Sequence, residues 1–225
     1  GGVYLENNSY FSASDNSRVS SNTTTQDCFT GQGSQGAGFY VSQSTVEYYG
    51  GNIYGNSSAD AGGAMFVTNG SNVNLSYVGM DTNESAEVGG GENTIGGAIG
   101  IVYDSEVNID HCTALLNSST SGGVGGLYAE NSNVNISNSI FWDNPGEWNN
   151  ESGQLIGSDY NVAYSDIQGG YPGEGNIDAD PLFCNTSYYN LAENSPAVGT
   201  AQDGDDMGYA GVDCEPIYSA NIESV

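Results

Sequence analysis

Short apolar stretches alternate with polar residues along the whole chain, and the clearest example runs from Gly125 to Asn144. It opens on two glycines, passes through a short apolar strand and a polar turn, enters the alternating segment Val134-x-Ile136 and ends on an asparagine. Apolar residues two positions apart, with polar residues between them, are typical of a strand that buries one face. No helical periodicity of comparable length occurs. The pattern therefore predicts an all-β protein.

The same unit occurs five times in the chain. The glycine pairs are Gly1-Gly2, Gly62-Gly63, Gly96-Gly97 and Gly125-Gly126, with Ala37-Gly38 as the degenerate copy, and the closing asparagines are Asn22, Asn56, Asn83, Asn117 and Asn144. The distance from the second glycine to the asparagine is 18 or 20 residues, whereas 7 to 16 residues lead to the next second glycine. A nearly fixed length followed by a variable one indicates a solenoid.

Equivalent positions of successive units carry apolar residues. One position holds Val46, Val73, Val107 and Val134; the position two residues later holds Tyr48, Leu75, Ile109 and Ile136; a third holds Ile53, Met80, Ala114 and Phe141. In stacked coils about 4.8 Å apart, like residues would form columns. We therefore expect a right-handed parallel β-helix with about five regular coils and an irregular C-terminal cap.

The repeat places the whole chain in one domain with three parts. We expect β-helix coils over residues 1–158, with long loops at 23–36, 84–95 and 145–158, then a last coil and cap over 159–215, and a strand-like tail over 216–225. The long loops should leave one edge, where a working face would lie, unless they are only tolerated insertions. The first coil should present an open edge that more solenoid, a cap or another copy of the chain covers.

The closing asparagines suit a corner, because asparagine tolerates left-handed or bridge geometry and its amide can bond to the next coil. We expect Asn22, Asn56, Asn83, Asn117 and Asn144 to form a column of amide hydrogen bonds. The first four also fit the Asn-x-Ser/Thr glycosylation pattern, but we prefer the structural role for them. Candidate sites for covalent glycans are Asn7, Asn69, Asn74, Asn135, Asn150 and Asn185.

The charge of the chain restricts its partners. The formal net charge is −27, with 28 acidic residues and a single cationic side chain, Arg18. This charge should repel nucleic acids, anionic membranes and anionic polysaccharides, so no nucleic-acid partner and no membrane insertion are expected. We interpret the acidity as solubility in a secreted or salt-adapted protein, with calcium binding as the alternative. The weak calcium candidates are Asp203, Asp205 and Asp206, or Glu174, Asp178 and Asp180, although neither set has the spacing of a known calcium loop.

The C-terminal third carries four motifs in a fixed order. They are YSDIQGG at 164–170, GEGNIDADPLF at 173–183, SPA at 195–197 and DMG at 206–208. This succession resembles the closing segment of a large, mainly bacterial group of secreted right-handed parallel β-helix repeat proteins, over about residues 125–214. The resemblance implies the β-helix fold and an extracellular or cell-surface location. It says little about function, because members serve as surface adhesins, as structural proteins and in unknown roles.

We expect this segment to be an end cap. Pro172, Pro181 and Pro196 disfavour regular pairing, and Leu182, Phe183, Tyr189, Leu191 and Met207 would cover the last coil. Cys184 and Cys214 bracket the cap, and a disulfide between them would close a 31-residue loop, worth roughly 3–4 kcal/mol in the chain-entropy model. Cys112 is expected in the core, whereas Cys28 is left either free or bridged through a loop.

Catalysis has to be considered because solenoids include pectate lyases and polygalacturonases. A lyase needs a strong base, commonly arginine or lysine, together with cations that face an anionic sugar, and Arg18 alone does not supply these. A hydrolase needs clustered carboxylates. The adjacent pair Asp205-Asp206 belongs to the expected structural ending, and the single histidine, His111, occupies a strand position next to Cys112. We therefore predict no catalytic constellation and no enzymatic cofactor.

Our leading hypothesis is a non-catalytic, extracellular structural or adhesive β-solenoid, either part of a surface adhesin or a subunit of a head-to-tail extracellular filament. The tail residues Ile217, Tyr218, Ala220, Ile222 and Val225 could add a strand to a neighbouring molecule. The alternative is a polysaccharide-binding or polysaccharide-cleaving β-helix module, in which Tyr48, Tyr49, Trp142 and Trp148 stack on neutral glycans.

Overall fold

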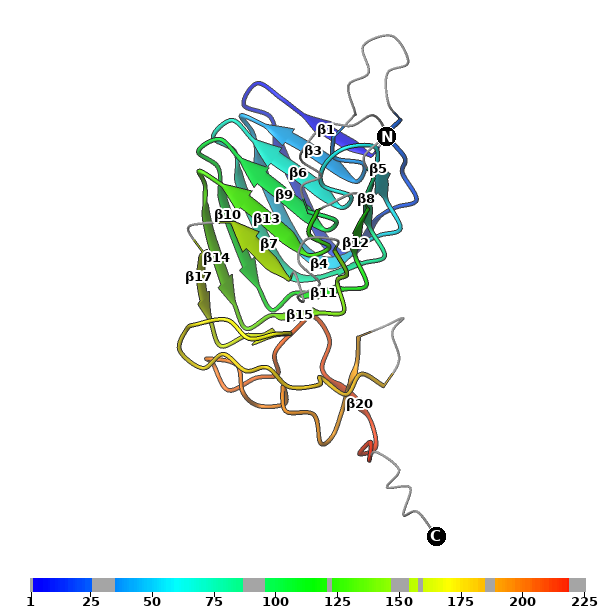
Figure 1. Ribbon diagram of the computed structural model, residues 1–225, viewed down its shortest axis with the longest axis vertical. Helices are drawn as coiled ribbons and strands as arrows, with labels where there is room; N and C mark the ends of the chain where they lie inside the picture. The colour runs from blue at the N-terminus through cyan, green and yellow to red at the C-terminus, as the bar shows by residue number, and fades with distance from the viewer. Residues whose placement is uncertain are drawn as a thin grey trace.

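The computed structural model describes residues 2–25, 35–86, 96–120, 123–146, 154–157, 160–184 and 189–218. These residues form strands and turns, with no α-helix among them. The strands belong to sheets of six, nine, three and two strands. Figure 1 shows the larger sheets curling around a common interior, with the C-terminal residues below them.

The sheets are built from strands that come from successive repeats. The six-stranded sheet contains β1 (Val3–Leu5), β3 (Phe39–Ser42), β6 (Met65–Thr68), β9 (Ile99–Val102), β13 (Leu127–Glu130) and β16 (Leu155–Gly157), in that spatial order. The nine-stranded sheet contains β2 (Tyr10–Ser20), β4 (Thr45–Tyr54), β7 (Asn72–Asp81), β10 (Glu106–Asp110), β11 (Thr113–Leu115), β14 (Asn133–Ser137), β15 (Ile140–Trp142), β17 (Tyr160–Ala163) and β18 (Asp166–Ile167). The three-stranded sheet contains β5 (Ser57–Ser58), β8 (Glu84–Ala86) and β12 (Ser118–Thr120), and the last sheet β19 (Leu191–Ala192) and β20 (Val212–Cys214).

All of these strand pairs are parallel. Neighbouring strands in each sheet come from successive repeats of the chain. The colour in Figure 1 therefore changes steadily from strand to strand down the sheets. The arrangement is all-β, with parallel strands in curled sheets, and is consistent with a parallel β-solenoid.

The register confirms the predicted apolar columns. Val46 pairs with Val73, Val73 with Val107, and Val107 with Val134. The columns that begin at Tyr48 and Ile53 pair in the same way. Their members are buried in one central cluster, together with inward residues of the six-stranded sheet. Burial of these columns supplies the main apolar driving force of the fold.

The closing asparagines form the expected amide column, which runs through Asn22, Asn56, Asn83, Asn117 and Asn144. Asn83 illustrates the bonding: its Nδ2 donates to Asn117 Oδ1 at 2.8 Å and to the carbonyl oxygen of Ile53 at 2.9 Å. Its Oδ1 accepts from Nδ2 and from the backbone N–H of Asn56, at 2.9 and 3.1 Å. This buried amide thus uses both donors and both acceptor positions. At the far end, Asn144 Nδ2 donates to Gln154 Oε1 at 2.6 Å.

The backbone geometry of this corner differs from the expectation. The left-handed residue is the one before each asparagine, with φ between +48° and +60° at Ser21, Gly55, Thr82, Leu116 and Asp143. The column asparagines themselves do not have positive φ. The preceding residue makes the sharp turn, and the asparagine is then free to point its amide inward along the stack.

Two further columns, built on serine, were not foreseen. Ser44, Ser71 and Ser105 donate their backbone N–H groups to the Oγ of Ser71, Ser105 and Ser132, at 3.2–3.3 Å. At another corner, Cys112 N–H donates to Ser139 Oγ at 3.0 Å, and Val78 N–H to Cys112 Sγ at 3.4 Å. Cys112 is buried as expected, and it also occupies a serine-like corner position. The signal in the sequence is that these residues stand two positions before the apolar columns.

Two of the expected loops contain strands. Residues 84–86 form β8 and residues 155–157 form β16, inside the stretches 84–95 and 145–158. Thr23, the first residue of the expected loop 23–36, forms a parallel bridge with Ser57. The closing asparagine is therefore a corner between two strands and not the end of a coil, so the backbone goes on pairing after it.

The C-terminal residues cover the side of the strand stack as well as its end. At the end, Tyr171 packs on the central cluster, with its ring 6.1 Å from that of Tyr160. The C-terminal segment, residues 189–218, instead packs Leu191 and Met207 against Ile140. Ile140 alternates with the inward Phe141 and so lies on the outer face of its sheet. We expected these apolar residues to cover the last coil, but Leu191 and Met207 cover the side of the strand stack at Ile140.

The outer face carries a column that receives this segment, and it consists of Asn52, Gly79, Thr113, Ile140 and Asp166. Thr113 Oγ1 accepts the backbone N–H of Tyr209 at 2.9 Å, and Asn52 Nδ2 donates to the Tyr209 hydroxyl at 3.4 Å. A Cβ at Gly79 would come within 2.7 Å of the Tyr189 ring, so only glycine leaves room for it.

We predict that Asn83→Ala lowers the free energy of unfolding by roughly 3–5 kcal/mol, because the Asn56 backbone N–H, one hydrogen of the Asn56 amide and the Ile53 carbonyl all lose a buried partner. Asn22→Ala, at the partly exposed start of the same column, should cost less than about 2 kcal/mol. Urea denaturation of both variants measures the difference. Equal losses would show that the column stabilises the fold no more inside than at its end.

Candidate functional site

The described surface has three notable hollows. One, of about 280 Å³, lies between the nine-stranded sheet and the C-terminal segment, and Tyr77, His111, Asp205, Asp206 and Tyr209 are among its lining residues. A second, of about 540 Å³, adjoins Tyr4 and Tyr40 on the six-stranded sheet. A third, of about 380 Å³, lies at a polar corner lined by asparagine, serine, threonine and glutamine, with Tyr10 beside them. The first brings together the most chemically capable side chains.

We call this first hollow the histidine cleft and define it by Tyr77, His111, Asp203, Asp205, Asp206 and Tyr209. Tyr77 lies within β7 and His111 directly after β10, and both have left-handed backbone, with φ of +53° and +46°. Their rings stack, with centroids 4.8 Å apart and planes within 13°. Asp203 belongs to the C-terminal segment, and its Oδ2 lies 3.5 Å from His111 Nε2. The cleft therefore joins two parts of the chain far apart in sequence.

The surroundings of His111 indicate its tautomer. Its Nδ1 lies 3.1 Å from Asp110 Oδ2. Asp110 Oδ1 accepts from Ser137 Oγ at 2.7 Å and from Asn138 Nδ2 at 2.9 Å. Burial tends to raise the pKa of Asp110, but the hydrogen bonds from Ser137, His111 and Asn138 outweigh it and lower that pKa. Because Asp110 is then a carboxylate, Nδ1 carries a hydrogen towards it. In the neutral tautomer that this contact favours, the buried Nε2 is an acceptor.

That acceptor has no hydrogen-bond partner among the described residues. The nearby charge is negative: after burial, Asp203 and Asp110 are the largest contributors to a raised pKa of the Tyr77 hydroxyl. The two ion-pair contacts in the described part of the chain both involve His111, with Asp110 and Asp203. From the sequence we placed His111 at a strand position, whereas it lies directly after β10, and we did not connect it with Asp203.

The calcium candidates accept hydrogen bonds from nearby groups of the chain. Asp203 Oδ1 accepts the Asp205 N–H, and Asp206 Oδ1 the Gly199 N–H. Glu174, Asp178 and Asp180 accept from the Tyr164 hydroxyl, the Gly169 N–H and the Leu182 N–H, respectively. Across the described ranges, no three histidine, cysteine or acidic side chains are grouped so that they could hold a metal ion.

One buried carboxylate was missed by the sequence reasoning, although it lies in the YSDIQGG motif. Asp166 is 0% exposed; its Oδ1 accepts the Ala179 N–H at 3.2 Å, and its Oδ2 has no partner among the described residues. Burial raises the pKa of Asp166 to about 7, with smaller contributions from the negative charges of Asp178 and Asp180. The signal in the sequence is that Asp166 is acidic, whereas the equivalent positions of earlier units hold the uncharged residues Asn52, Gly79, Thr113 and Ile140.

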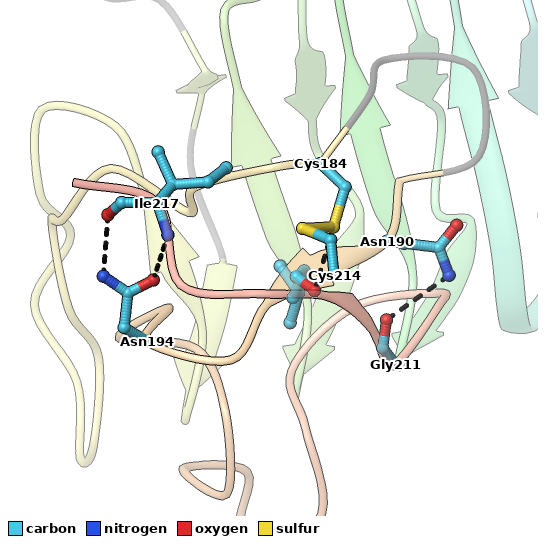
Figure 2. The surroundings of a disulfide bond; sticks show 7 residues. Cys184, Asn190, Asn194, Gly211, Cys214 and Ile217 are labelled. Carbon is cyan, nitrogen blue, oxygen red and sulfur yellow. Dashed lines mark hydrogen bonds between the residues drawn. A yellow bond between two sulfur atoms is a disulfide. The ribbon is translucent and has the colours of Figure 1, made fainter. Parts of the chain in front are cut away.

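Cys184 and Cys214 form a disulfide, with their Cα atoms 6.0 Å apart. Such a bond is compatible with an oxidising, extracellular environment. Figure 2 shows how the residues around it fasten the end of the chain. Asn194 Nδ2 donates to the Ile217 carbonyl at 2.8 Å, and the Ile217 N–H donates to Asn194 Oδ1 at 2.9 Å (Figure 2). The disulfide and this amide clamp hold the C-terminal segment together.

The hydrogen bonds of Asn194 involve Ile217, the first residue of the expected assembly strand. Ile217 is hydrogen bonded to its own chain through Asn194. Tyr218 is 80% exposed. Ala220, Ile222 and Val225 lie outside the described residues, as do Cys28, Trp148, Asn150 and Asn185.

The described glycosylation candidates occupy two kinds of position. Asn7 and Asn69 lie exposed at turns with left-handed backbone. Asn74 and Asn135 instead belong to a second, outward amide column, because Asn108 Nδ2 donates to Asn74 Oδ1 and Asn135 Nδ2 to Asn108 Oδ1, both at 2.8 Å. The amide nitrogens of Asn74 and Asn135 are thus occupied by hydrogen bonds to neighbouring strands.

The aromatic residues proposed to stack on sugars are distributed differently from the expectation. Tyr48 is only 1% exposed and belongs to an inward column, so its assignment to a sugar surface is wrong. Trp142 packs partly buried against the cluster of the C-terminal segment, whereas Tyr49 is 53% exposed. An aromatic pair that was not proposed lies elsewhere: the Tyr4 and Tyr40 rings stack 4.8 Å apart beside the hollow of about 540 Å³.

The pKa of Asp166 predicts how stability depends on pH. Because the folded pKa is raised above the ordinary 3.8 to about 7, the folded state loses stability as pH rises through this interval, and the penalty is complete above it. Asp166→Asn cannot ionise and should be more stable than the wild type at pH 8, by roughly 1–3 kcal/mol, with no such gain at pH 4. Thermal unfolding at both pH values measures this. The exposed control Asp213→Asn should show little change, and a pH-independent effect of Asp166→Asn would contradict the prediction.

No helix among the described residues is long and apolar enough to cross a membrane. A scan against protein-family models, a search of curated proteins and a search of solved structures each found no match to the chain.

Proposed function

We propose that the chain is a secreted right-handed parallel β-helix of about five coils with a C-terminal cap, and that it serves as a non-catalytic extracellular structural or adhesive scaffold. The in-register columns and the four C-terminal motifs support this fold. The residues best suited to chemistry also have structural roles. Burial raises the pKa of the Cys112 thiol to about 12, which disfavours the nucleophilic thiolate.

The observation that carries the assembly part of the proposal is the edge formed by β1 and β2. Among the described residues, β1 pairs only with β3 and β2 only with β4. The inward residues Phe11, Ala13 and Val19 are only partly buried, whereas their partners Val46, Tyr48 and Ile53 on β4 are fully buried. An edge with unpaired backbone groups and half-covered apolar side chains favours the addition of another strand layer.

We propose a second copy of the chain as the occupant of this edge. Its C-terminal end would lie against β1 and β2 of the first copy, and repetition of such a head-to-tail contact gives an open filament. The exposed Tyr218 lies beyond the clamped Ile217, where the chain leaves the cap. Figure 1 shows this end and the β1 edge at opposite extremes of the molecule, as a head-to-tail contact requires.

Two substitutions on the same strand test the proposal. Ala13 points inward and is partly buried, whereas Ser12 points outward and is exposed. In an assembled edge, a lysine at position 13 would be buried, so Ala13→Lys should abolish the large species in sedimentation velocity and negative-stain images. Ser12→Lys adds the same charge and should assemble like the wild type.

Thermal melts of both lysine variants control for folding of the single molecule. A wild type that stays monomeric at high concentration would contradict the filament. A longer natural chain that is monomeric, with the amides of β1 and β2 protected from hydrogen exchange, would show that more solenoid covers the edge instead.

Neutral-polysaccharide binding is a second candidate, favoured by the hollow beside the Tyr4–Tyr40 stack. Tyr4 is 65% exposed, and Thr24 and Gln35 add polar groups to the same hollow. Aromatic faces with neighbouring amide and hydroxyl groups suit uncharged sugars. Tyr4→Ala should weaken binding to a neutral polysaccharide in affinity electrophoresis by about tenfold. Tyr10→Ala, equally exposed at 66% but outside this hollow, should not, and equal retardation of the two variants would count against the site.

A further inference from the structure

When its ring is neutral, His111 places an acceptor, Nε2, opposite the carboxylate of Asp203. His111 Nε2 is buried and lacks a hydrogen-bond partner among the described residues. Asp203 Oδ2, 3.5 Å away, belongs to a side chain that is half exposed. Since Nδ1 of the same ring supplies its hydrogen to the Asp110 carboxylate, the neutral imidazole has none left for Asp203. This pair of acceptors calls for a donor from outside.

The charge of the cleft also lacks a partner within the chain. The C-terminal segment contributes Asp203, Asp205 and Asp206 to the cleft. On the sheet, Asp110 contacts the Nδ1 atom of His111. The single cationic side chain of the protein, Arg18, is exposed on β2 and forms no ion pair among the described residues. The negative field at this point is therefore open to an external cation.

The shape and the aromatic lining narrow the chemistry of that cation. Tyr77 and Tyr209 line the cleft, and Tyr49 lies next to Tyr77 with its ring centroid 5.6 Å away. Aromatic faces attract guanidinium and ammonium groups. A guanidinium group presents N–H donors in a rigid planar fork, which suits two acceptors a few ångströms apart better than a single ammonium does. Metal coordination is less well served, because no group of three metal ligands occurs among the described residues.

We propose that the histidine cleft is a binding site for a guanidinium group, held by His111 Nε2 and Asp203 Oδ2 and flanked by the rings of Tyr77 and Tyr209. The volume of about 280 Å³ admits such a head group and part of its stem. Because Asp203 comes from the C-terminal segment and His111 from the end of β10, the bound group would also fasten that segment to the sheet. This site is independent of the β1–β2 edge and of the scaffold role.

The single histidine makes a direct test possible. With ¹⁵N-labelled histidine, a long-range ¹H–¹⁵N spectrum shows only the two ring nitrogens of His111. At pH 7.5 we expect Nδ1 to be protonated and Nε2 to be bare. Methylguanidinium chloride should then shift the Nε2 resonance saturably towards that of a hydrogen-bonded nitrogen. Methylurea, its neutral analogue, and sodium chloride at the same concentration should not.

Matched variants locate the effect. Asp203→Asn should weaken the methylguanidinium response at least tenfold, whereas Asp213→Asn, an exposed carboxylate outside the cleft, should leave it unchanged. Thermal melts check that both variants remain folded. A short arginine-containing peptide forms a second arm. Tighter binding of the peptide than of methylguanidinium identifies a partner protein as the source of the group, and equal or weaker binding identifies a free guanidinium compound.

Three results would overturn the proposal. The first is a ring that is protonated on both nitrogens at pH 7.5 before any ligand is added, because a proton would then join His111 to Asp203. The second is an equal response to sodium chloride, which would mean charge screening alone. The third is an undiminished response in folded Asp203→Asn. None of these outcomes bears on filament formation, so the two proposals stand or fall separately.

Discussion

Parallel strand pairing in strict register is the constraint on which the rest of this structure depends. A shift of one residue in any strand would turn every inward side chain outward, and the chain prevents such a shift with polar columns at its corners. The Asn83 amide can meet all four of its hydrogen-bonding requirements only when Asn56 and Asn117 lie directly above and below it. Apolar columns supply the burial, and amide columns select the register in which that burial occurs.

The need for polar columns at the corners beside the apolar columns explains a composition rich in asparagine, serine and glycine. Backbone groups that would be left unpaired at the corners are satisfied by Ser71 and Ser105, whose hydroxyls accept from the neighbouring strand. Most of the polar residues inside the molecule therefore stabilise the fold, and the surfaces that could serve a partner lie where the columns end or where the C-terminal segment crosses them.

The C-terminal segment breaks the regularity and thereby creates the most distinctive surface. It is tied internally by the Cys184–Cys214 disulfide and by the Asn194 clamp on Ile217, and it lies along an outer column that accepts it at Gly79, Thr113 and Ile140. Because this segment carries Asp203, Asp205 and Asp206, its docking brings further carboxylates to His111 and adds to the negative charge of Asp110 on the sheet. A terminal segment that covers a repeat array thus also builds a site on its side.

From the sequence alone, the parallel strands, the apolar columns, the inward asparagine column and the Cys184–Cys214 pairing could be predicted, because each follows from equal spacing or from a local motif. The left-handed residue before each asparagine, the strands β8 and β16 and the serine columns were missed, since the backbone path at a corner decides which residue turns and which pairs. The lateral docking of residues 189–218, the burial of Asp166 and the approach of Asp203 to His111 were decided only by the tertiary structure. Those contacts join residues far apart in the chain, and no local period or spacing encodes which outer column a non-repeating segment will cover.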